Sequence, residues 1–163
     1  MTDNPLLDFT GLPRFGAIRP EHIAPAVDTL LAENRALIAR LTAPGTAASW
    51  EAFVAPMDDA AERLSRAWGA VGHLHGVLDS PELREAYNAS QPKIVQYHTE
   101  LGQNLALFGK YKTLGASPAF AHLSAAQRKI IENEIRDFRL SGAELPVEQK
   151  SRFAAIMEEL ARL

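Results

Sequence analysis

The fold of this 163-residue chain is decided by residues 53–78, which read FVAPMDDAAERLSRAWGAVGHLHGVL. Apolar side chains recur in this stretch at steps of one, three or four residues. They are Phe53, Met57, Ala60, Ala61, Leu64, Ala67, Trp68, Val71, Leu74 and Leu78. This spacing places them on one face of an α-helix, because the helix repeats every 3.6 residues. Ser49 is the predicted N-cap of this helix, and Pro56 is expected to kink it near its start.

The same period predicts four further helices, bounded by capping residues and by proline or glycine. They are expected over residues 20–43, 81–114, 125–141 and 146–163. The helix over 81–114, kinked at Pro92, would be about 50 Å long at 1.5 Å per residue. Ser124 and Gln127 form a predicted capping box, and Gly142 is a predicted left-handed stop.

No useful strand-like alternation occurs, so the sequence predicts an all-α fold. Short connections favour an elongated antiparallel bundle of about five main helices. In residues 1–19, prolines and glycines separate short apolar groups, which predicts an extended N-terminal arm docked on the bundle. The length favours one helical domain over residues 1–163. The last helix has no proline, glycine or asparagine stop, and one interpretation is that it continues in a longer parent protein.

Composition excludes several classes of function. The chain has no cysteine, which rules out a disulfide framework, Cys-ligated zinc, iron–sulfur clusters and a thiol nucleophile. The net charge of −3 argues against non-specific binding to nucleic acid or to an anionic membrane. No apolar run approaches the roughly 20 residues of a membrane span, and no signal-peptide pattern opens the chain. A cytoplasmic location is therefore expected.

The histidines do not have the spacing of a metal site. A helical two-histidine site needs ligands three or four residues apart, and the five histidines contain no such pair. They are His22, His73, His75, His98 and His122. His73 and His75 are expected on opposite sides of one helix, and no His-Glu-x-x-His motif occurs. We therefore expect no catalytic, cofactor-binding or metal-binding residue in this chain.

The remaining polar and aromatic candidates are better explained by structure than by chemistry. Asp58, Asp59 and Glu62 are interpreted as a solvated helix face, with Asp59–Arg63 and Glu62–Arg66 as predicted ion pairs at i,i+4. Gly69 and Gly72 follow no strand, so they do not form a phosphate-binding loop. The two tryptophans and three tyrosines are expected to pack in the core or at its rim, although the tyrosines could reach a substrate. They are Trp50, Trp68, Tyr87, Tyr97 and Tyr111.

Seven segments carry a resemblance to a known family. They are NPLL (4–7), LPRF (12–15), IRPEH (18–22), LSRAW (64–68), SPELREAYN (80–88), QRKIIEN (127–133) and RDFRLSG (136–142). In this order they resemble the N-terminal region of the bacterial oligopeptidase A group of thimet-oligopeptidase-like zinc metallopeptidases. The resemblance covers essentially the whole chain.

This resemblance implies a parent protein several times longer, with two lobes flanking a channel that admits short peptides. It also implies a zinc site far downstream, on a His-Glu-x-x-His helix with a further glutamate. The two histidines and that second glutamate hold zinc there, and the first glutamate is the base for the metal-bound water. None of this motif is present here, so no catalytic residue is transferred, and zinc is expected in the parent alone.

Two hypotheses follow from these observations. In the first, the chain is the inactive N-terminal helical lobe of a zinc-dependent cytoplasmic oligopeptidase. It forms part of the channel wall, with the catalytic lobe as partner and short peptides as the parent's substrates. In the second, it is a stand-alone helical protein-interaction module. The first also predicts that the isolated fragment exposes apolar helix faces and can dimerise through them.

Overall fold

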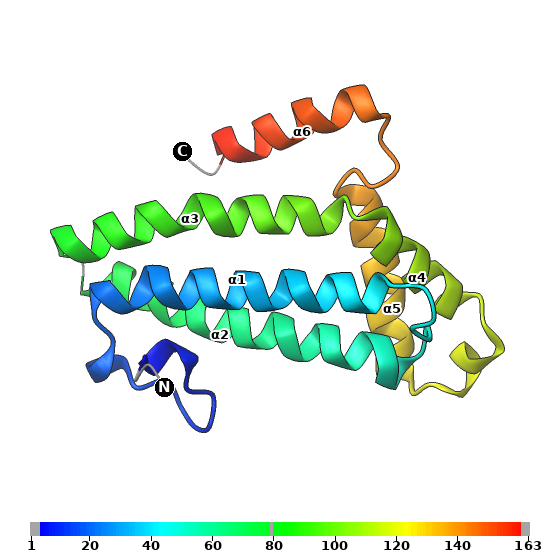
Figure 1. Cartoon of the computed structure of the whole chain (residues 1–163), viewed down its shortest axis with the longest axis horizontal. Helices are drawn as coiled ribbons and strands as arrows, with labels where there is room; N and C mark the ends of the chain where they lie inside the picture. Colours follow the sequence, from blue (N-terminus) through cyan, green and yellow to red (C-terminus); the bar gives the residue numbers. More distant parts are fainter. Residues whose placement is uncertain (1–3, 79, 161–163) are drawn as a thin grey trace. The chain divides into compact units, whose positions relative to one another are not determined.

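A computed structural model describes residues 4–78 and 80–160 of the chain, and all regular secondary structure in these residues is helical (Figure 1). The main helices are α1 (Pro20–Thr42), α2 (Ala55–Val77), α3 (Pro81–Gly102), α4 (Leu105–Gly115), α5 (Ala125–Leu140) and α6 (Val147–Leu160). Shorter helical turns lie at η1 (Pro5–Leu7), η2 (Phe15–Ala17), η3 (Trp50–Val54) and η4 (Pro118–His122). The all-α prediction is confirmed, and the described residues form one main helix more than the five expected.

The chain divides into two compact units, each built from two separate stretches of sequence. Unit 1 comprises Met1–Ala36 and Asp58–Ile94, and unit 2 comprises Leu37–Met57 and Val95–Leu163.

The core of unit 1 is formed by the apolar faces of α1, α2 and α3. Ile23, Val27 and Leu30 of α1 and Leu64 and Val71 of α2 are almost completely buried. These residues follow the spacing that predicted the helices, so the apolar stripes supply the burial that stabilises them.

The core of unit 2 is built around aromatic side chains. Phe53 contacts Tyr111 with ring centroids 4.7 Å apart, and Phe108 stacks on Phe138 at 5.6 Å. Ile131 of α5 is fully buried in the same cluster. The rings therefore hold together η3, α4 and α5, which are far apart in the sequence.

The predicted capping residues are present. The Ser49 hydroxyl accepts a hydrogen bond from the amide of Ala52 at the start of η3, immediately before α2. Ser124 and Gln127 form the expected reciprocal capping box of α5. Gly142, two residues after α5 ends, has a φ of 84°, a left-handed conformation that favours glycine.

The prediction of one long helix over residues 81–114 is wrong. The helix ends at Gly102, and α4 begins separately at Leu105. The Asn104 side chain accepts hydrogen bonds from the amides of Ala106 and Leu107, so it caps the new helix. Gly102 lies so close to Ser141 that a Cβ atom at this position would be 2.5 Å from the Ser141 Cβ. This close approach requires glycine at the point where the helix ends.

The N-terminal segment differs from the predicted extended arm in two respects. It contains two short helical turns, η1 and η2, within the residues described. Its apolar side chains are also not all docked, because Leu6 and Ile18 are buried whereas Leu12 is 91% exposed.

Candidate functional site

The tyrosines do not form a shared site. Tyr97 and Tyr111 are buried, and Tyr111 contacts Phe53 and Phe138 in the core of unit 2. Tyr87 is half-buried and stacks on neighbouring rings in unit 1. Packing in the core or at its rim is therefore the role that the structure gives them, as the sequence predicted.

The histidines have separate surroundings. His73 lies on the exposed side of α2, with its ring centroid 5.2 Å from that of Phe15. His75 instead stacks on Tyr87 of α3 at 4.2 Å. Across residues 4–78 and 80–160, no three His, Asp or Glu side chains lie close enough together to hold a metal ion.

Arg63 and Arg66 of α2 do not form the predicted pairs with Asp59 and Glu62 but contact other residues. Arg63 forms a salt bridge of 3.0 Å with Glu33 of α1. Arg66 donates hydrogen bonds to the carbonyl oxygens of Phe9 and Gly11 in the N-terminal segment. Both guanidinium groups also lie over the Phe9 ring, at 4.9 and 5.9 Å from its centroid. These arginines hold unit 1 together and are not arranged as a ligand site.

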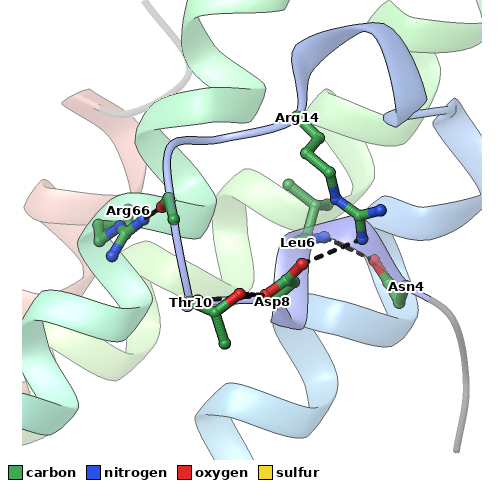
Figure 2. A network of polar contacts seen from close by, with 7 residues as sticks. Asn4, Leu6, Asp8, Thr10, Arg14 and Arg66 are labelled. Carbon is green, nitrogen blue, oxygen red and sulfur yellow. Dashed lines mark hydrogen bonds and ion pairs between the residues drawn. The ribbon is translucent and has the colours of Figure 1, made fainter.

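A polar network organises the N-terminal segment in front of α2 (Figure 2). Asn4 accepts a hydrogen bond from the amide of Leu6, and its amide group donates to the carbonyl of His22 at 2.8 Å. Asp8 accepts hydrogen bonds from the hydroxyl and the amide of Thr10 and pairs with Arg14 at 3.2 Å. The hydrogen bonds from Thr10, aided by Arg14, lower the pKa of the Asp8 carboxyl.

A groove of about 350 Å³ lies between α3 and α6 in unit 2. It is lined by Gln96, Thr99, Glu100, Gln103, Ala154 and Glu158. The amide nitrogen of Gln103 is buried without a hydrogen-bond partner. Five of the six lining residues are polar, and none of the six is a histidine.

Exposed apolar side chains are most frequent on α6. Ile156 is 46% exposed, Met157 37% and Leu160 57%, and α6 has no buried residue. Such exposure is unusual for a regularly spaced apolar stripe, which normally packs against another element.

None of the helices of at least 18 residues among those described is apolar enough to cross a membrane.

The described residues thus form an all-α fold. Residues 27–150 match the family described as Neurolysin/Thimet oligopeptidase, N-terminal domain, and the chain belongs to this family.

Three curated relatives align with nearly the whole of this chain. Oligopeptidase A of Haemophilus influenzae is 44% identical over 161 residues, which are 98% of this chain and 23% of the relative. Oligopeptidase A of Salmonella typhimurium and that of Escherichia coli are 41% and 39% identical, each over 98% of this chain and 24% of the relative. The chain thus spans about a quarter of the length of the curated relatives that it matches.

Sequence reasoning missed the N-terminal network and the groove. Arg66 and Gly11 are 55 positions apart, and Gln103 and Ala154 are also distant in sequence. No local spacing signals these distant contacts, because they depend on how the helices pack. The bonds between Asn4 and Leu6 and between Asp8 and Thr10 are local turn contacts, and these could have been predicted.

Proposed function

We propose that residues 1–163 act as one N-terminal, non-catalytic domain of a zinc-dependent oligopeptidase that degrades short peptides in the cytoplasm. The observation that carries this proposal is the match to three oligopeptidases A over 98% of this chain but only 23–24% of their length. The part of those relatives that this chain does not cover has room for the catalytic machinery.

The residues that the structure describes do not fit a zinc site. Catalytic zinc takes three protein ligands, usually histidine and carboxylate side chains. His73 and His75 have different neighbours, and no suitable group of three ligands occurs in the described residues. We therefore place the metal and its chemistry in another part of the parent chain.

The role left for this domain is to shape the space in which peptides bind. The apolar and aromatic side chains buried in its cores are close-packed and hold the helices of each unit in place. A channel wall needs this rigidity. A rigid wall excludes folded proteins from a channel and admits short flexible chains. In this proposal the catalytic lobe is the partner of the domain within one polypeptide.

The test compares the 163-residue chain with the product of the complete native reading frame. Zinc content is measured by metal analysis, and cleavage of a short fluorogenic peptide is measured with and without a chelator. We expect stoichiometric zinc and chelator-sensitive cleavage in the complete product alone. Stoichiometric zinc, or cleavage that a chelator abolishes, in a clean preparation of the 163-residue chain would refute the proposal.

The exposed stripe on α6 supports an accompanying proposal, that the isolated chain associates into dimers. Two copies could bury the same apolar surface against each other, formed by Ile156, Met157 and Leu160. Light scattering over a range of concentrations tests this directly. A strict monomer at high concentration would contradict it.

A further inference from the structure

We infer that one face of α6 is the docking surface for an amphipathic helix of the parent chain that lies beyond residue 163. The α6 face is defined by Phe153, Ile156, Met157 and Leu160. This inference rests on the proposed function, because it requires a longer parent chain.

The spacing of these four residues is that of a buried helix face. Steps of three, one and three residues place them in one stripe. The same kind of stripe is buried in α1, where Ile23, Val27 and Leu30 are fully covered. On α6 it is exposed at Ile156, Met157 and Leu160, so the covering element is missing from the described residues.

The groove between α3 and α6 does not supply this cover. Ala154 and Glu158 line the groove. Ile156 and Leu160 each follow one of them by two positions, which turns them by roughly 200° around the helix axis. Ile156 and Leu160 therefore point away from the groove. A helix as short as α6 is marginal in water without tertiary packing.

The comparisons leave room for a covering element in the parent chain. The match to the N-terminal domain of the family ends at residue 150, in the first turn of α6. The matched relatives extend over more than three times the length that this chain covers. The α6 face itself carries no charged side chain, so the matching occupant is a helix with an apolar stripe.

Hydrogen exchange followed by mass spectrometry tests the inference on the complete product and on the 163-residue chain. At concentrations at which light scattering finds the 163-residue chain monomeric, we expect amides of residues 147–160 to exchange about 100-fold more slowly in the complete product. Amides around Leu30 and Leu31, which are buried in both, should exchange alike and serve as the internal reference.

Two matched variants of the complete product identify the face. Ile156→Asp places a charge within the α6 face and should abolish the added protection. Ala155→Asp places the same charge on the exposed opposite side of α6 and should leave the protection intact.

The outcomes separate this inference from the proposed function. If the reading frame stops at Leu163, the longer parent does not exist and both fail. In another outcome, the complete product shows zinc-dependent peptide cleavage while the amides of α6 exchange equally fast in both proteins. In that case only the inference fails. Protection of α6 in the complete product that rises with protein concentration would overturn the inference in favour of a second copy on the α6 face.

Discussion

The ring of Tyr87 in α3 stacks on that of Trp68 in α2, with centroids 4.7 Å apart and planes inclined by 14°. His75, two turns further along α2, also stacks on Tyr87, at 4.2 Å and 13°. Tyr87 thus joins two rings of one helix to a second helix. This contact is available only when α2 and α3 have paired, so it links local helix formation to the packing of unit 1.

Replacing Tyr87 tests the contribution of this stack. Tyr87→Leu keeps an apolar side chain but removes the ring, and we expect it to lower the free energy of unfolding by about 1 kcal/mol. Tyr87→Phe keeps the ring and should stay close to the original stability. Urea unfolding followed by tryptophan fluorescence measures both. Equal stability of the leucine and phenylalanine variants would show that ring stacking contributes nothing.

The close approach of Gly102 to Ser141 predicts opposite effects of two glycine substitutions. Gly102→Ala should destabilise the protein by about 1–3 kcal/mol, because its Cβ would be too close to that of Ser141. Gly109→Ala, within α4 and with no atom within 4 Å of the new Cβ, should instead stabilise it by about 1 kcal/mol.

A double variant shows whether the contact is the cause. Ser141→Gly should restore part of the stability that Gly102→Ala removes, since it deletes the opposing Cβ. Thermal unfolding followed by circular dichroism measures all four proteins. A Gly102→Ala variant as stable as Gly109→Ala would show that the contact with Ser141 does not require glycine at position 102.

The capping box of α5 predicts a cost for losing one hydroxyl group. Ser124→Ala removes the acceptor for the amide of Gln127 and should cost about 1 kcal/mol of stability. Ser65→Ala is the matched control, because Ser65 is exposed within α2, where alanine is the better helix former. Denaturant midpoints should therefore fall for the first variant and stay level or rise for the second.

The hydrogen bonds to Asp8 predict a pKa that depends on Thr10. The side-chain and backbone hydrogen bonds from Thr10 hold the Asp8 pKa below its ordinary value of 3.8. Thr10→Val removes the hydroxyl but keeps the amide, so it should move the pKa part of the way back. Arg14→Gln should have a smaller effect, since the charge of Arg14 is the weaker cause. Carboxyl titration by NMR distinguishes the two, and equal shifts would contradict this order.

The direction of the pH dependence follows from the lowered pKa. The contacts of Asp8 in the folded chain stabilise its carboxylate over the protonated form. Their contribution to the free energy of unfolding is therefore present above pH 3.8. It is lost as the pH falls through the folded-state pKa of Asp8. Asp8→Asn should remove this part of the acid sensitivity.

The sequence predicted most of the helices because their signals are local. The stripe that includes Val27 and Leu30, the cap at Ser124 and the left-handed glycine at 142 each depend on residues a few positions apart. The cap at Asn104 that begins α4 is also a local signal, but the prediction missed it. The close approach of Gly102 to Ser141 was not predictable in this way, because Ser141 follows α5, far away in the sequence.

The ion pairs and the surface features likewise depend on contacts between distant parts of the sequence. The i,i+4 rule pairs Arg63 with Asp59, whereas the structure pairs it with Glu33 of α1. A long arginine side chain can choose between partners on its own helix and on a neighbour, and packing decides between them. The groove between α3 and α6 and the exposure of the α6 face likewise follow from packing alone.

The central claim is that the catalytic machinery lies in the same polypeptide but outside this chain. Sequencing the native gene past the codon for Leu163 tests it most directly. We expect an open frame that reaches a His-Glu-x-x-His helix followed by a further glutamate. A stop codon directly after Leu163 would contradict it.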